Sequence, residues 1–256
     1  MNYFEPYTAA ERYSKGRPRF HSNTIRHISD FLQLKNKLGS ALDIACGTGL
    51  STKPLLEIAA NVYGTDTSQS MLNFALDKDK IKYAIAAAAQ QPFEDNYFDL
   101  VTVGSGVHWF DIDTFLPEAR RVLKNKSWLV LYDNFFIAAM ENNPGFKDWH
   151  QQVYLNKFPA PARNDKYDWS DENLKEQHFD LVKEETFTNP VSFNKNELAL
   201  YFTSQSNIIS VVEKNETTYE EVEDWLDKEL TVFFINNKVS QIINFGNWIK
   251  YIQKTK

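Results

Sequence analysis

The stretch that decides the fold is "ALDIACGTGLST", residues 41–52. An apolar run that ends at Ala45 leads into a turn with two glycines, Gly47 and Gly49, and a helix is expected directly after it. Glycine lacks a β-carbon, so it takes positive φ angles and lets a ligand approach the main chain closely. A helix that starts here points free N–H groups toward a carboxylate or phosphate. The stretch is typical of a ligand-binding turn, although two glycines alone can also make only a tight turn.

Composition places limits on the class of protein. The chain has 256 residues, of which 43% are hydrophobic and 14% aromatic, which suits one globular α/β domain. A formal net charge of −6 argues against general affinity for nucleic-acid phosphates. The single cysteine, Cys46, allows no intramolecular disulfide, and a small loop residue is a better interpretation than a nucleophile. Since neither an apolar signal segment nor a run of about 18 apolar residues is found, we expect a cytoplasmic protein without a membrane span.

Strands and helices are expected to alternate along the first half of the chain. Apolar runs predict strands at 40–45, 60–66, 80–86, 98–107 and 127–134. Helical spacing predicts helices at 22–34, around 55–59, at 71–76 and at 115–125. This alternation is typical of a parallel sheet with right-handed crossovers.

The second half is less regular. Residues 135–179 contain a predicted helix with turn-forming residues at both ends. This pattern indicates an insertion of the kind that often forms a lid. After it come a strand at 180–193, helices at 194–205 and 217–230, and an antiparallel closing strand at 240–254. Thr218 and Glu221 have the spacing of a capping box.

A second feature supports a ligand at the glycine turn. About seventeen residues after Gly49, "VYGTD" ends the second strand in Asp66, where a carboxylate can accept both hydroxyl hydrogens of a ribose. The pair indicates an adenosine-like ligand. A nicotinamide dinucleotide is disfavoured, because its glycine pattern needs a small residue where Thr52 stands.

At this point the sequence resembles a known family. The blocks "LDIACGTG", "VYGTDTSQSML", "QPFEDNYFDLVTV" and "EARRVLK" follow one another at the spacings of class I S-adenosylmethionine-dependent methyltransferases of the methyltransferase-11 type. "GSGVHWFD" resembles the subgroup that includes trans-aconitate methyltransferase. The resemblance covers roughly residues 1–134. It implies an α/β fold, with a Rossmann-like, seven-stranded, mostly parallel sheet, helices on both faces and a helical cap insertion.

The resemblance also implies one methyltransferase domain over residues 1–256. Its expected parts are an N-terminal segment over the site (1–35), a cofactor-binding core (36–134), the cap insertion (135–179) and a C-terminal completion of the sheet (180–256).

The resemblance further implies a set of cofactor-binding residues for S-adenosylmethionine. They are Asp43, Ala45, Gly47, Gly49, Asp66, Thr67, Met71, Ala88, Gln90 and Ser105. Asp43 would lie beside the methionine amino group, directly or through water and the glycine loop, and Asp66 would hold the ribose. Relatives often carry an acid on the adenine amino group where this chain has Ala87, so Gln90 or a main-chain carbonyl would have to replace it.

Methyl transfer from a sulfonium is an in-line displacement with an excellent leaving group, so alignment and exclusion of water matter most. No catalytic triad is required, and the histidines show no metal-ligand spacing, so no metal is expected. His108 follows the fourth strand and could act as a catalytic base, or it could only form the pocket wall with Trp109.

The expected substrate-binding residues are Tyr7, Tyr13, Arg17, His108 and Trp109. Aromatic faces and a cation in the N-terminal segment suit a sulfonium or an acidic acceptor, although such a run can also be a solvated basic stretch. Arg163 and Lys166 are further candidates.

The predicted function is therefore S-adenosylmethionine-dependent methylation of a small molecule, with carboxylic acids as the first class to consider. The alternatives are a non-catalytic S-adenosylmethionine-binding protein and, less favoured, a nucleic-acid methyltransferase. We expect a monomer or homodimer that binds a small-molecule acceptor, with no nucleic acid and no membrane as partner.

Overall fold

The computed structural model describes residues 3–162, 166–236 and 239–255. The chain divides into two compact units. The helix-rich unit comprises Met1–Pro18, Phe135–Ala162 and Thr188–Gly246, and the sheet unit comprises Arg19–Asn134, Arg163–Phe187 and Asn247–Lys256. These bounds differ from the four expected segments, since 135–179 is shared between the units. The expectation of one methyltransferase domain stays a prediction.

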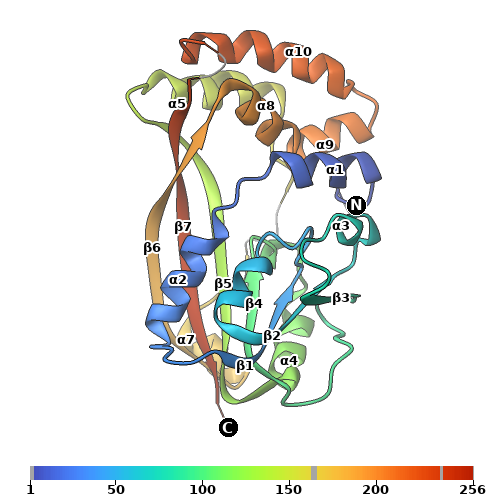
Figure 1. The fold of residues 1–256 in the computed structure, drawn as a ribbon, viewed down its shortest axis with the longest axis vertical. Helices are drawn as coiled ribbons and strands as arrows, with labels where there is room; N and C mark the ends of the chain where they lie inside the picture. The colour runs from blue at the N-terminus through green and yellow to red at the C-terminus, as the bar shows by residue number, and fades with distance from the viewer. Residues whose placement is uncertain (1–2, 163–165, 237–238, 256) are drawn as a thin grey trace. The chain divides into compact units, whose positions relative to one another are not determined.

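The strands form a seven-stranded sheet in the order β3-β2-β1-β4-β5-β7-β6 (Figure 1). Their bounds are β1 Leu38–Ile44, β2 Ala59–Asp66, β3 Ile81–Ile85, β4 Phe98–Gly104, β5 Leu123–Met140, β6 Phe179–Phe193 and β7 Gln241–Lys254. The pairs among β1 to β5 are parallel. Lys254, at the end of β7, donates its Nζ to the carbonyl of Leu123 at the start of β5, and Thr255 N donates to His178 O just before β6. Strand β7 is therefore antiparallel to both neighbours, which confirms the predicted mostly parallel sheet.

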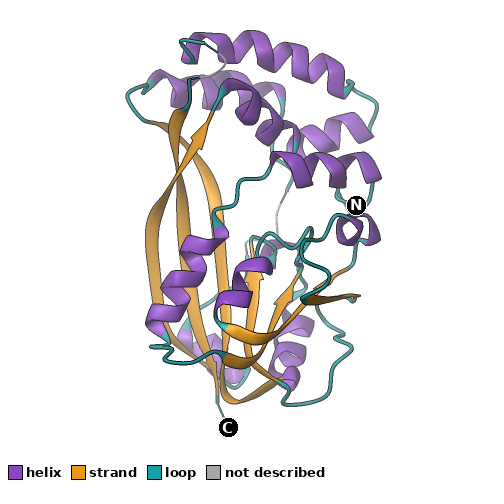
Figure 2. Cartoon of the chain, viewed as in Figure 1, coloured by secondary structure: helices purple, strands orange, loops and turns teal. Residues whose placement is uncertain are grey.

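Both units contain helices, which are purple in Figure 2. Their bounds are α1 Tyr7–Gly16, α2 His21–Phe31, α3 Gln69–Asn73, α4 Ile112–Val122, α5 Gly145–Trp149, α6 Leu155–Lys157, α7 Asp171–Glu176, α8 Lys195–Thr203, α9 Ser206–Glu213 and α10 Tyr219–Leu230. Short 3₁₀ helices lie at η1 Lys53–Glu57, η2 Val107–Trp109 and η4 Thr231–Phe233, and η3 His150–Tyr154 is a π-helix. No described helix has the length and apolarity that a membrane crossing needs.

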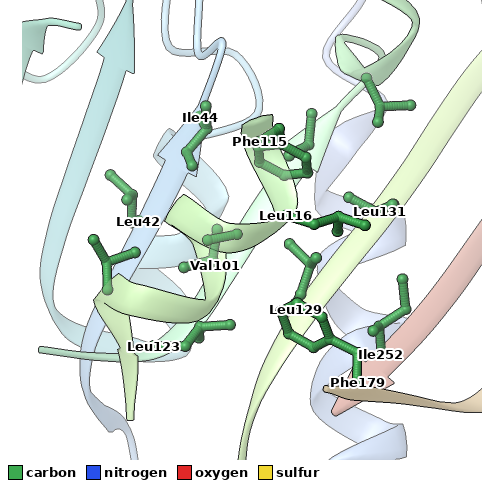
Figure 3. Close-up of a cluster of buried hydrophobic side chains, with 14 of the residues drawn as sticks. Leu42, Ile44, Val101, Phe115, Leu116, Leu123, Leu129, Leu131, Phe179 and Ile252 are labelled. Carbon is green, nitrogen blue, oxygen red and sulfur yellow. The ribbon is translucent and has the colours of Figure 1, made fainter. Parts of the chain in front are cut away.

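The core of the sheet unit has two apolar clusters, because alternate residues of a strand point to opposite faces. Leu42 and Val101 belong to the cluster that contains Phe115 and Leu116 of α4 (Figure 3). Their neighbours Ala41 and Leu100 belong to the other cluster, with Ile25 and Ile28 of α2 among its members. The same strands thus bury both faces, as expected for a parallel sheet with helices on each side.

Two predictions about local structure have clear outcomes. The capping box of α10 is confirmed, because Glu221 N donates to Thr218 Oγ1 at 3.2 Å and Thr218 N donates to Glu221 Oε2 at 3.0 Å. The helix expected around 55–59 is wrong in type and extent, since η1 ends at Glu57 and Ala59 already begins β2. Only residues 45–58 connect β1 to β2, and a 3₁₀ helix covers more length per residue than an α-helix.

The helix-rich unit explains the high aromatic content. Its rings contact one another in a network made of Phe136, Phe146, Trp149, His150, Tyr154, Phe158, Phe193, Tyr201, Phe202, Trp225, Phe233 and Phe245. Helix α8 packs against both α1 and α10. Segments far apart in the sequence therefore share this aromatic core.

Candidate functional site

The centre of the candidate site is the buried carboxylate of Asp43 at the end of β1. Its Oδ2 accepts hydrogen bonds from Ser51 Oγ at 2.6 Å and Thr52 Oγ1 at 2.7 Å, and its Oδ1 accepts one from Thr102 Oγ1 at 2.9 Å. Burial raises the pKa of Asp43 to about 6, although the three hydroxyl hydrogen bonds act in the opposite direction. The carboxylate therefore joins β1 to the glycine loop and to β4. It has no exposed surface, so any effect of Asp43 on a ligand would pass through that loop.

Asp66, at the end of β2, holds the other side of the same loop. Its Oδ2 accepts a hydrogen bond from Gly47 N at 2.8 Å, and its Oδ1 accepts one from Ser68 N at 2.9 Å. The residue is half-buried. Asp66 is therefore held by the main chain at the end of β2, with part of its surface open to solvent.

The glycine loop has a backbone that most residues avoid. The φ angles are 57° at Ala45, 53° at Gly47 and 76° at Gly49. A β-carbon at Gly49 would lie 2.2 Å from Tyr83 Oη, and one at Gly47 would lie 2.9 Å from Met71 Cε. Both atoms are the far ends of side chains, so the positive φ angles are the main reason why glycine is favoured at these two positions. The stretch that follows Gly49 forms turns and the short helix η1, so the expected α-helical N-terminus is absent here.

A second turn, after β4, packs on this loop. Ser105 has a φ of 56°, and a β-carbon at Gly106 would lie 2.9 Å from the β-carbon of Ala45. Ser105 N donates to Tyr132 O at 2.8 Å, and Asn134 N donates to Ser105 Oγ at 3.3 Å. Two left-handed residues that are not glycine therefore lie in loops that touch, at the carboxyl ends of neighbouring strands. Backbone strain of this kind is concentrated at functional sites.

The loop after β3 is built mainly by main-chain contacts. Ala87 and Gln90 are both exposed and form one isolated bridge. The buried neighbour Gln91 instead accepts a hydrogen bond from Thr65 Oγ1 at 2.9 Å and donates to Ala87 O at 2.8 Å. Gln91 therefore holds this loop on β2, a role that sequence reasoning missed.

The remaining predicted residues of the sheet unit differ in their exposure. Thr67 is exposed, Met71 is buried and Ala88 is half-buried. His108 lies in η2, half-buried, with its ring centroid 4.6 Å from that of Trp109, which is 40% exposed. This pair follows directly on the Ser105 turn.

In the helix-rich unit, Tyr13 and Arg17 lie together. The Arg17 guanidinium lies 4.8 Å from the ring centroid of Tyr13 and 5.3 Å from that of Tyr201, and its Nη2 donates to Ser204 O at 3.0 Å. Its Nε is buried without a hydrogen bond, and among the described residues no carboxylate forms an ion pair with Arg17. Tyr7, at the start of α1, is 59% exposed.

The neighbouring cation Arg12 is less suited to bind an acid. Arg12 forms an ion pair with Glu223 and stacks on Tyr219. Lys166 is exposed in the sheet unit, and Arg163 lies outside the described residues.

Sequence reasoning also missed Ser51, Thr52 and Thr102 as partners of Asp43. The signal was available in part, because two hydroxyl residues follow the glycines directly in "GTGLST". Only the pairing of β1 with β4 brings Thr102 beside Asp43.

Comparison with known proteins finds similarity to methyltransferases. Residues 42–131 match the methyltransferase domain family. A Dictyostelium discoideum protein described as a methyltransferase is 25% identical over 86% of this chain and 83% of its own length. The 2-phytyl-1,4-naphthoquinone methyltransferase of Nostoc punctiforme is 34% identical over 49% of this chain, and the match covers 57% of that enzyme. Among solved structures, a type II methyltransferase from Anaeromyxobacter dehalogenans has the same fold, with a TM-score of 0.73, 17% identity, and coverage of 92% of this chain and 97% of that one.

The strain at Ala45 predicts that Ala45→Gly is tolerated or stabilising. A left-handed residue with a β-carbon costs about 1–2 kcal/mol of strain. Glycine removes this strain, but it loses more conformational entropy on folding than alanine does, so only part of the gain remains. We expect the free energy of unfolding to rise by up to about 1 kcal/mol in denaturant titrations. The control Ala41→Gly, in regular β1, should lower it by about 1 kcal/mol or more. Equal destabilisation by both variants would contradict the strain.

Asp43 predicts a specific pH dependence of stability. Its folded pKa of about 6 lies above the ordinary value of 3.8, so the folded protein holds a proton that the unfolded chain releases. The associated stabilisation is complete below about pH 4 and is lost as the pH rises through about 6. The free energy of unfolding of the wild type relative to Asp43→Asn should therefore fall by up to about 3 kcal/mol between pH 4 and pH 7. Exposed Asp79→Asn is the control, and a pH-independent difference for Asp43→Asn would refute the raised pKa.

Proposed function

We propose that this chain is an S-adenosylmethionine-dependent methyltransferase that methylates a small acidic molecule. The matched domain over residues 42–131 and the similar Dictyostelium discoideum protein support the activity, and the structural neighbour shares the fold. One observation carries the cofactor assignment. Asp66 ends β2 and is held by two main-chain N–H groups beside a left-handed glycine loop, which is the place where a carboxylate binds the hydroxyls of a ribose.

The residues present fit the cofactor. Asp66 would hold the ribose, and the backbone from Ala45 to Gly49 would face the methionine arm together with the Ser105 turn. Asp43 would support this loop indirectly, because it accepts hydrogen bonds from Ser51 and Thr52. When bound, S-adenosylmethionine supplies an activated methyl group on a sulfonium. The protein then has to align the acceptor and keep water out.

Arg17 supports an acidic acceptor. A guanidinium that stacks between two tyrosine rings and has a buried N–H without a partner is suited to bind a carboxylate, because charge-assisted hydrogen bonds of this kind are strong and directional. The resemblance of "GSGVHWFD" to the trans-aconitate methyltransferase subgroup agrees with this proposal. A carboxylate acceptor needs no base. The substrate-binding roles of His108 and Trp109 stay predictions.

A second class of acceptor is favoured by one relative. The Nostoc punctiforme enzyme is named for a naphthoquinone substrate, and its match covers about half of this chain. A carbon acceptor of the quinol type has to lose a proton, for which His108 is the candidate base. Our proposal also retains the expected cytoplasmic monomer or homodimer, without nucleic acid or membrane as partner.

Asp66→Ala tests the cofactor assignment. Loss of the charge-assisted hydrogen bonds should weaken binding of S-adenosylmethionine and S-adenosylhomocysteine by about 1–3 kcal/mol in calorimetric titration. Exposed Asp79→Ala should bind as the wild type does. Unchanged affinity in Asp66→Ala would remove this residue from the site, and binding of NAD alone by the wild type would overturn the proposed cofactor.

Arg17→Gln tests the acidic acceptor. In a screen of small carboxylic acids and naphthoquinols, followed by release of S-adenosylhomocysteine, we expect turnover with an acid and a KM about 10–100-fold higher in the variant. Affinity for S-adenosylhomocysteine should not change. Arg12→Gln is the matched control, because the charge of Arg12 is already paired with Glu223. Turnover with quinols alone, or an equal effect of both substitutions, would refute the acidic acceptor.

A further inference from the structure

A buried His–Tyr pair lies behind the turn that follows β4. His21, the first residue of α2, is 5% exposed, and its Nδ1 lies 3.0 Å from the Oη of Tyr132. Tyr132, in β5, has no exposed surface, and its ring meets the imidazole edge to face. One hydrogen bond therefore joins two polar groups in the interior of the sheet unit.

The phenol end of Tyr132 supports both loops of the candidate site. A β-carbon at Gly104 would lie 2.7 Å from Tyr132 Cζ and Oη and 3.1 Å from the β-carbon of Ser51. The carbonyl of the same tyrosine accepts the hydrogen bond from Ser105 N. Tyr132 thus contacts the Ser105 turn through its main chain and through its hydroxyl end, next to the residue that binds Asp43.

Packing alone does not explain this pair. A phenylalanine would fill the same ring volume, and burial of a hydroxyl and an imidazole costs free energy that hydrogen bonds only partly offset. What the hydroxyl adds is a fixed position, because His21 determines where the phenol end lies against Gly104. A turn with a strained residue at Ser105 needs such support from its surroundings.

The position of the pair indicates which part of the ligand it affects. Asp66 ends β2, and the sheet order runs from β2 through β1 and β4 to β5. On one side of Asp66, residues 86–89 are four alanines, which suit the apolar face of a purine. On the other side lie the loops after β1 and β4 with the hydroxyl residues Ser51 and Ser105, which suit a charged amino-acid arm better than the alanines do. A nucleoside held by Asp66 would therefore extend its methionine arm toward Tyr132.

We propose that His21 and Tyr132 are positioning residues for the methionine arm of the cofactor. They act by holding the Gly104–Ser105 turn, and neither has to touch the ligand. This inference rests on the proposed cofactor.

The test compares two ligands that share the adenosine and the sulfur. S-adenosylhomocysteine carries the amino-acid arm, whereas 5′-methylthioadenosine lacks it. In Tyr132→Phe, we expect the affinity for S-adenosylhomocysteine to fall about five- to tenfold and that for methylthioadenosine to stay within about twofold. His21→Leu should behave in the same way. His21→Asn should restore binding, because Asn Oδ1 occupies nearly the place of the imidazole Nδ1.

Tyr63→Phe is the matched control, because it removes a hydroxyl whose partner is Tyr97, at 2.8 Å, away from both loops. It should bind both ligands as the wild type does. Melting temperatures show whether each variant is folded. If Tyr132→Phe does not fold, the two His21 variants test the proposal. The inference is wrong if both ligands lose affinity together, if neither does, or if His21→Asn fails to restore binding. Failure of the wild type to bind either ligand would instead refute the proposed cofactor.

Discussion

The structure of the site depends on one buried carboxylate that accepts hydrogen bonds from three hydroxyl groups. Asp43 has no exposed surface, and water cannot replace Ser51, Thr52 or Thr102 as its partners. A buried charge without hydrogen bonds is costly, so the loop that carries two of these hydroxyls has to stay folded over the end of β1. The position of the loop in turn places Gly47 N on Asp66, and so fixes this carboxylate at the end of β2.

The same constraint explains why strained residues are tolerated nearby. Ala45 and Ser105 adopt left-handed backbone conformations in two loops that touch, and each is held by contacts from a neighbouring strand. Tertiary contacts of this kind over-determine the backbone, which is the condition under which strain persists. The loop after β3 is held in another way, since Gln91 and the main chain hold it on β2.

In the helix-rich unit, the fold distinguishes two arginines, Arg12 and Arg17. Arg12 and Arg17 are five residues apart along one short segment and look equivalent in the sequence. In the fold, Glu223 of α10 neutralises Arg12, whereas Arg17 lies among tyrosine rings with a buried Nε that has no partner. Only the second guanidinium is left available for an anionic ligand.

The sequence by itself determined the α/β class, the alternation of strands and helices, the glycine loop and the acid at the end of β2, because these depend on local periodicity and on residues with special backbone preferences. It failed on the type of η1, since strand spacing imposed a tighter helix there than apolar periodicity suggests. Only the tertiary structure decided which residues meet at the site. Thr102 reaches Asp43, and Tyr132 reaches His21 and Gly104, through strand pairing and packing between residues far apart in the chain. Contacts of that kind leave no periodic signal in one sequence, because each partner is chosen by the fold rather than by its neighbours along the chain.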